Sequence, residues 1–184
     1  MQDTAFLGHI GLMRLAIDEK DFSQARDAAR AALMIKPAST LAASHLLSLE
    51  IRRADWKAAL PALDVISKGK AKLKIKEGKT SQKAALLSQR CTLHFLLASD
   101  LQVKDRPAAI KALILSLKAD AGFLPALNML ADLYIDDKAY GKAVRILEAG
   151  FRKNPHETIT MRLKRAWKSN DGQFIDRLTK FLGK

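Results

Sequence analysis

The feature that most constrains this sequence is a pattern that recurs at a spacing of 34 residues. Each copy has a short polar or aromatic triplet followed three residues later by an alanine: Lys20-Asp21-Phe22 with Ala25, Ala54-Asp55-Trp56 with Ala59, Lys104-Asp105-Arg106 with Ala109, and Lys138-Ala139-Tyr140 with Ala143. The first and last copies also share a closing proline, Pro37 and Pro155. A period of this length, on the order of 20–50 residues, indicates stacked copies of one small structural unit.

The apolar residues recur at helical spacing, and strict two-residue alternation is almost absent. Alanine and leucine, both strong helix formers, dominate, and Gly and Pro fall mostly at the ends of the periodic segments. We therefore expect an all-α chain with about ten helices joined by short turns. The expected helices cover residues 4–19, 22–35, 41–53, 56–69, 82–101, 106–118, 124–135, 140–153, 158–168 and 173–181.

The repeats group into two tandem pairs. Counting back from the triplets, the four repeats begin near Phe6, Thr40, Arg90 and Leu124, so the interval between the second and third repeats is longer than the other two. The extra length matches a lysine-rich insertion. We expect one continuous domain with four parts: repeats one and two in 1–68, the insertion in 69–81, repeats three and four in 82–155, and a basic capping helix pair in 156–184.

The formal net charge of +13 is concentrated in two places, the insertion and the tail. The insertion and its flanks carry Lys68, Lys70, Lys72, Lys74, Lys76, Lys79 and Lys83. The simplest interpretation is a solvated loop. One alternative is binding to an anionic membrane surface, where each lysine contributes about 1 kcal/mol. Nucleic-acid binding is the weaker alternative, because no aromatic residues are interleaved for base stacking.

Other sequence features limit the function further. No apolar run approaches the roughly 18 residues of a membrane span, and no local signature of a nucleophile, its base and an orienting group is present. The single cysteine cannot form an internal disulfide. We expect neither an enzyme nor a bound metal or cofactor.

The repeat resembles the tetratricopeptide (TPR) family in its 34-residue length, in the small residue after each turn, and in the aromatic residues Phe22, Trp56 and Tyr140. The resemblance implies a TPR-like right-handed α-solenoid of antiparallel helix pairs. The small side chain lets the second helix of a pair approach the first closely. In such arrays a partner usually binds the inner face, which the first helices of the pairs line.

A narrower resemblance is to the TPR region of the HemY family. It is carried by the opening segment from Ala5 to Leu12, by the long insertion, and by Asn154-Pro155-His156 and the later Asn170-Asp171-Gly172. Members of that family come from bacterial haem-biosynthesis operons and have two membrane-spanning helices ahead of the repeats. The resemblance implies a scaffold near enzymes of late haem biosynthesis, at the bacterial inner membrane, with this portion facing the cytoplasm and no transmembrane segment in this chain.

We therefore predict a protein–protein interaction scaffold whose partner is another protein or peptide. The TPR resemblance assigns the inner face to Leu7, Ile10, Arg14, Ile17, Leu41, Ser44, Ser48, Arg52, Cys91, His94, Ala98, Gln102, Asn128, Asp132 and Asp136. Arg14 and Arg52 could each bind a carboxylate through two parallel hydrogen bonds, which suits an acidic peptide or a chain end. An alternative is haem or porphyrin handling by Cys91 and His94, three residues apart on one predicted helix.

Overall fold

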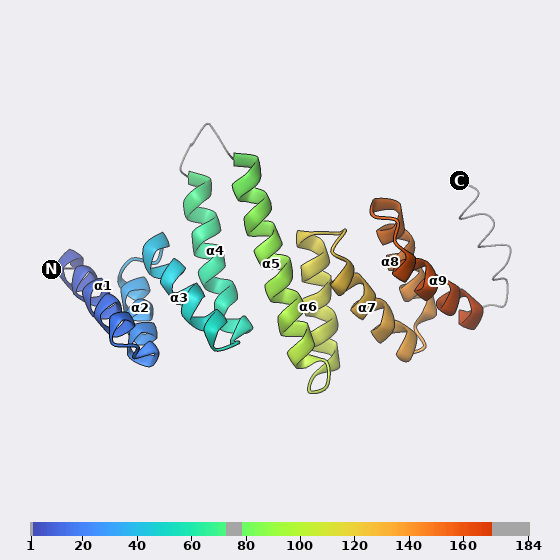
Figure 1. The fold of residues 1–184 in the computed structure, drawn as a ribbon, viewed down its shortest axis with the longest axis horizontal. Helices are drawn as coiled ribbons and strands as arrows, with labels where there is room; N and C mark the ends of the chain where they lie inside the picture. The colour runs from blue at the N-terminus through green and yellow to red at the C-terminus, as the bar shows by residue number, and fades with distance from the viewer. Residues whose placement is uncertain (1, 73–78, 171–184) are drawn as a thin grey trace. The chain divides into compact units, whose positions relative to one another are not determined.

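The structure, a computed structural model, describes residues 2–72 and 79–170, which form nine α-helices and no strand (Figure 1). The helices are α1 (Gln2–Asp18), α2 (Phe22–Ile35), α3 (Thr40–Arg52), α4 (Trp56–Lys72), α5 (Lys79–Leu101), α6 (Arg106–Ala119), α7 (Leu124–Asp136), α8 (Tyr140–Lys153) and α9 (Glu157–Asn170). The chain divides into two compact units, Met1–Leu93 and His94–Lys184. We call them unit I and unit II.

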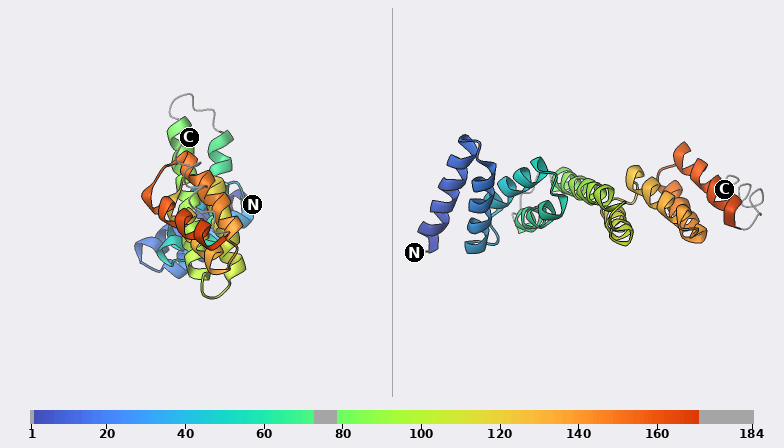
Figure 2. Two further views of the ribbon diagram at one scale, coloured as in Figure 1. Left: turned by 90° about the vertical axis from the view of Figure 1, so that its right-hand side faces the viewer. Right: turned by 90° about the horizontal axis from the view of Figure 1, so that it is seen from below.

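Consecutive helices pack as pairs within each unit. Helices α1 and α2 lie side by side in unit I, as do α8 and α9 in unit II (Figure 1; Figure 2, right). The all-α, TPR-like array of antiparallel helix pairs predicted from the repeat is confirmed. The predicted tenth helix, 173–181, lies outside the described residues.

The described helices match their predicted bounds within a few residues, with the largest differences beside the insertion. Helix α4 continues through Gly69, where the sequence predicts its end, and α5 begins at Lys79. A Cβ added at Gly69 would lie 2.2 Å from Thr40 Cγ2 of α3. Glycine therefore acts here as a contact residue within a helix, and its weak helix propensity, costing about 1 kcal/mol relative to alanine, does not end the helix.

The four turns between paired helices share one backbone hydrogen bond. In each turn the N–H two residues before the second helix donates to the carbonyl three residues earlier, at 3.0–3.1 Å: Lys20 to Ile17, Ala54 to Ile51, Lys104 to Leu101, and Lys138 to Ile135. Three of these donors have a positive φ of 55° to 63°, a conformation that costs an L-residue about 1 kcal/mol or more. The same strained geometry recurs because the position of the second helix requires it.

A side-chain cap follows each of the first three turns. The carboxylates of Asp21, Asp55 and Asp105 accept a hydrogen bond from the backbone N–H three residues on, at 2.9–3.0 Å. This interaction satisfies one of the N–H groups that a helix start leaves without an intrahelical partner. In the fourth turn Ala139 takes this place without a side-chain cap. The triplet of the sequence repeat is therefore a helix-capping turn.

The alanine that follows each triplet is completely buried at the crossing of the paired helices. Ala25, Ala59, Ala109 and Ala143 all have no exposed surface. A close approach of this kind is also found at Gly150 of α8, where an added Cβ would lie 2.2 Å from Leu127 Cδ2 of α7. Small side chains thus set the distance between the helices of a pair, as the repeat predicts.

An ion pair between a buried glutamate and an exposed arginine links the first two helix pairs within unit I. Glu50 of α3 is fully buried, and its Oε1 accepts a hydrogen bond of 2.6 Å from the guanidinium of Arg30 on α2. At the other end of α2, Lys36 lies 2.6 Å from Asp3 and 4.6 Å from the ring centroid of Phe6 on α1. The hydrogen bond from Lys36 and its positive charge lower the pKa of the Asp3 carboxyl.

Replacing Gly150 with alanine tests the close approach of α7 and α8. The added methyl overpacks against Leu127, which costs about 1–3 kcal/mol, whereas the gain in helix propensity is at most about 1 kcal/mol. We expect Gly150→Ala to lower the free energy of unfolding in urea. Shortening Leu127 to valine in the same chain should recover part of the loss, so that the double variant is more stable than the sum of the two single changes predicts. Additive effects would contradict the contact.

Candidate protein-binding surface

The predicted inner face is well exposed on α1 and α3 of unit I. Seven of the predicted residues on these two helices lie outside the core of unit I. Six of the seven are exposed to solvent: Leu7, Arg14, Leu41, Ser44, Ser48 and Arg52. Leu7 and Leu41, at equivalent positions one repeat apart, are 65% and 41% exposed. The seventh, Ile17, is half-buried and packs against the core. Unit I thus presents leucine, serine and arginine side chains on neighbouring first helices.

The polar residues of this surface differ in how they are already engaged. Ser44 and Ser48 donate their hydroxyl protons to carbonyls of their own helix, at 2.8 and 3.1 Å. The guanidinium of Arg52 lies over the ring of Phe22, 4.3 Å from its centroid. Stacking occupies the flat face of a guanidinium and leaves the N–H groups at its edge directed outward. Arg52 is therefore oriented by Phe22 and keeps its capacity to donate to a carboxylate.

Three predicted inner-face residues lie instead in the hydrophobic core. Ile10, Cys91 and Ala98 are buried. The first packs with the core shared by α1 to α4, and the last with the core of α6 and α7. The prediction carried these positions over from the TPR resemblance, which does not show which side chains a neighbouring helix covers. These three side chains are corrected from surface to core.

The pair considered for haem is only partly accessible. The thiol of Cys91 is buried and donates a hydrogen bond of 3.1 Å to the carbonyl of Ser88. His94, on the same helix, is half-buried, and Gln102 farther along α5 is exposed. Within residues 2–72 and 79–170, no group of three or more His, Cys, Asp or Glu side chains is placed to hold a metal ion.

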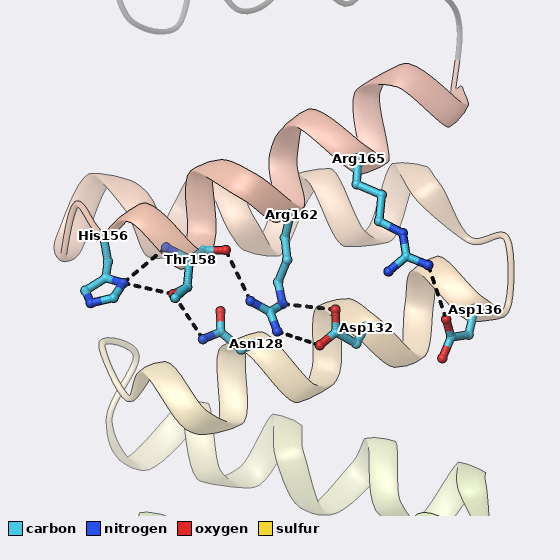
Figure 3. Close-up of polar contacts among 7 residues, drawn as sticks. All are labelled: Asn128, Asp132, Asp136, His156, Thr158, Arg162 and Arg165. Atoms are coloured by element: carbon cyan, nitrogen blue, oxygen red, sulfur yellow. Dashed lines mark hydrogen bonds and ion pairs between the residues drawn. The ribbon is translucent and has the colours of Figure 1, made fainter.

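In unit II the predicted inner-face residues of α7 are contacted by α9 (Figure 3). Arg162 donates from Nε and from a terminal nitrogen to the two carboxylate oxygens of Asp132, at 2.9 and 2.8 Å. Asn128 Nδ2 donates to Thr158 Oγ1 at 3.2 Å. Asp136 lies 4.0 Å from Arg165 of α9 and 3.8 Å from Arg106 of α6. A partner would have to compete with these internal bonds.

The start of α9 is fixed by a turn that the sequence did not reveal. The backbone N–H of Thr158 donates to His156 Nδ1 at 3.2 Å, and the Thr158 hydroxyl lies 2.9 Å from the same nitrogen. This arrangement holds Thr158 against Asn128 and aligns Arg162 with Asp132 (Figure 3). The sequence contains the two partners of this ion pair, Arg162 and Asp132. Pairing them requires knowing that α9 packs on α7.

The lysine cluster falls largely outside the part of the chain that can be described. Lys68 is exposed. Lys74 and Lys76 lie outside the described residues, and the structure does not describe the side chains of Lys70, Lys72, Lys79 and Lys83. The anionic-surface hypothesis stays a prediction. Separately, none of the helices in the described ranges combines the length and the apolar character needed to cross a membrane.

Comparisons with known proteins add two distant structural likenesses. No family model and no curated protein matches the chain. The crystal structure of MamA protein has 15% identity and a TM-score of 0.47, over 97% of this chain and 88% of that one. The structure of YrrB, described as a TPR protein with an unusual peptide-binding site, has 10% identity and a TM-score of 0.45, over 96% and 86%. Similarities this weak add nothing to what the helix pairs themselves establish.

The bidentate ion pair between Asp132 and Arg162 should contribute measurably to the free energy of unfolding of unit II. Both side chains are partly shielded from solvent, and the geometry is bidentate. We expect a coupling energy of about 1 kcal/mol from the double-mutant cycle of Asp132→Ala and Arg162→Ala, at the upper end for exposed pairs. Urea unfolding at low and high salt measures it, and the coupling should fall as salt rises. The Glu148 and Arg152 pair, 3.7 Å apart on the surface of α8, is the control. Equal coupling in both pairs would count against a specific role for α9.

Proposed function

We propose that this chain is a protein-interaction scaffold whose inner face in unit I binds an acidic peptide segment or a carboxylate chain end. The observation that carries the proposal is the exposure of Arg14 on α1 and Arg52 on α3, on the same helices that expose Leu7 and Leu41. Two guanidiniums and two leucines offer charge recognition beside apolar contact. Arginine and exposed apolar anchors are typical of protein-binding surfaces.

The two units differ in their suitability for this role. In unit II the equivalent first helix, α7, has its carboxylates bonded to α9 and α6. In unit I, within residues 2–72, Arg52 lies over the ring of Phe22, which orients it, and neither Arg14 nor Arg52 forms an ion pair. We therefore place the contact on α1 and α3 of unit I and leave out of it the predicted inner-face residues of unit II, His94, Gln102, Asn128, Asp132 and Asp136.

The narrower part of the proposal concerns biological context. The resemblance to the HemY family supports a role beside enzymes of late haem biosynthesis at the bacterial inner membrane, with this portion facing the cytoplasm. The partner would then be one of those enzymes, offering an acidic segment to unit I. Direct haem handling is the less favoured alternative, because the Cys91 thiol is buried and bonded to Ser88.

Binding of acidic peptides tests the proposal directly. The probes are fluorescent peptides that end in two acidic residues and a free carboxylate, each paired with the same peptide as its C-terminal amide. We expect the free-carboxylate peptides to bind more tightly, and Arg14→Ala with Arg52→Ala to weaken binding at least about tenfold, as expected when charge-assisted bidentate contacts are lost. Anisotropy titration of the full chain at two salt concentrations measures this.

The matched control is Arg152→Ala, which removes another exposed arginine, on α8 of unit II. It should leave binding unchanged. An unchanged affinity in the double variant would contradict the inner-face assignment. Equal affinity for the acid and amide forms would rule out the chain end and assign binding to the acidic side chains. A second arm uses the same variants as bait in a bacterial lysate. Failure to recover any enzyme of late haem biosynthesis with the unmodified chain would contradict the HemY context and leave the peptide result standing.

A further inference from the structure

The outer edge of the first helix pair exposes apolar side chains that the repeat buries elsewhere. Leu12 and Leu15 of α1 are 39% and 54% exposed. Their counterparts in the second and fourth repeats are all buried, with at most 8% exposed: Leu46, Leu49, Leu130 and Leu133. In Figures 1 and 2, α2 lies along one side of α1, and no other described helix of unit I lies along the opposite side. The stripe is the contact face of an internal repeat without its neighbour.

Gly8 and the adjoining surface also indicate a contact face that lacks its neighbouring helix. A Cβ added at Gly8 would meet nothing within 4 Å, whereas Ala42 and Ala126, at the equivalent positions, are fully buried. Beside the stripe, α1 and α2 form a shallow hollow of about 490 Å³ whose lining includes Leu12, Asp27 and Ala31. There is space along the whole edge for another helix.

Unit II shows what covers this face when a neighbour is present. Leu130 and Leu133 of α7 belong to one buried cluster with Ala109 and Leu113 of the preceding helix, α6. The first residue of α6, Arg106, donates a hydrogen bond of 2.9 Å to the carbonyl of Leu133. Arg106 also pairs with two consecutive carboxylates at the end of α7, Asp136 at 3.8 Å and Asp137 at 2.9 Å. The neighbour is an amphipathic helix that begins with an arginine.

Helix α1 has acidic and apolar residues at the positions through which α7 contacts α6. Asp18 and Glu19 stand where α7 has Asp136 and Asp137, and Leu15 stands where α7 has Leu133. Within the described residues, no ion pair involves the carboxylates of Asp18 or Glu19. The second repeat is different: α3 has Arg52 at the corresponding position, and the preceding helix begins with Phe22, on which Arg52 stacks. The charge at this position thus matches the first residue of the helix that covers it.

We propose that the outer edge of α1, formed by Gly8, Leu12, Leu15, Asp18 and Glu19, binds an amphipathic helix of a partner protein. That helix carries an arginine in its first turn, facing Asp18 and Glu19, and small apolar residues along the stripe that faces the two leucines. It occupies the place that α6 occupies on α7. Leu12 and Leu15 lie on a different stripe of α1 from Leu7 and Arg14, so the apolar part of this surface is separate from the inner face proposed above. Asp18 stands where α3 has Arg52 and borders the inner face.

The chain's own α6 supplies a suitable probe. A fluorescent peptide of residues 104–121, acetylated and amidated, is titrated into the full chain and followed by anisotropy. We expect saturable one-to-one binding that weakens at least about tenfold in Leu12→Asp with Leu15→Asp, and similarly in Asp18→Lys with Glu19→Lys. Because these side chains are exposed, the unfolding midpoint of each variant should stay close to that of the unmodified chain.

A charge exchange distinguishes specific docking from general attraction. The probe carrying Arg106→Glu should bind the Asp18→Lys, Glu19→Lys variant better than it binds the unmodified chain. Asp100→Lys, which reverses an exposed acid on α5, and Arg14→Ala with Arg52→Ala should both leave the original probe's affinity unchanged. Loss of probe binding in the arginine variant would place the peptide on the inner face and overturn the proposal.

An isolated helix of this length is only partly formed in water, so a second measurement fixes the helix in place. Residues 90–123 are joined directly to Phe6 in place of residues 1–5, which preserves the 34-residue period. We expect slower hydrogen exchange across α1 than in the same fusion carrying Arg106→Glu and Leu113→Asp. No probe binding together with equal exchange in the two fusions would overturn the proposal. Concentration-dependent dimerisation of the chain that Leu12→Asp with Leu15→Asp abolishes would also overturn it, by assigning the edge to a second copy.

Discussion

The close crossing of paired helices over a small side chain is the constraint on which the rest of the structure depends. Ala25, Ala59, Ala109 and Ala143 are completely buried at this crossing, and at Gly150 even a methyl group would overlap Leu127. Protein interiors are packed densely enough that an added methylene is felt. Small residues at one fixed place in the repeat therefore fix the spacing of every pair, and the shared capping turn fixes its direction.

Polar pairs between successive helix pairs then determine how neighbours match within each unit. Arg30 reaches the buried Glu50 across α2 and α3, Arg106 reaches Asp137 across α6 and α7, and Arg162 grips Asp132 across α7 and α9. The three pairs lie at different positions of the repeat and differ in sequence. Such contacts contribute modestly to the free energy of folding but disfavour wrong neighbours strongly, because an unmatched charge would be left partly buried. The acidic residues at the end of α1, Asp18 and Glu19, fit this pattern, because they stand where α7 has the carboxylates that pair with Arg106.

The repeat and its helices could be predicted from the sequence because their signals are local. The small residue after each turn, the 3.6-residue periodicity and the capping aspartates are all readable without a structure. The inner-face assignment was less successful. Ile10, Cys91 and Ala98 are buried, the first and last of them in clusters with side chains of neighbouring helices. The acids of α7 are engaged because α9 packs on them. Both effects depend on contacts between residues about 30 positions apart, for which periodicity gives no information.

The most direct test of the account is the free energy of unfolding of Ala143→Leu compared with Ala149→Leu on the same helix. Both changes add the same side chain to α8, but Ala143 is buried at the helix crossing and Ala149 is exposed. We predict that Ala143→Leu lowers the stability measured by urea unfolding by about 2 kcal/mol or more, as expected for overpacking, and that Ala149→Leu changes it by less than about 0.5 kcal/mol. Equal effects of the two substitutions would contradict the claim that small residues set the packing of the helix pairs.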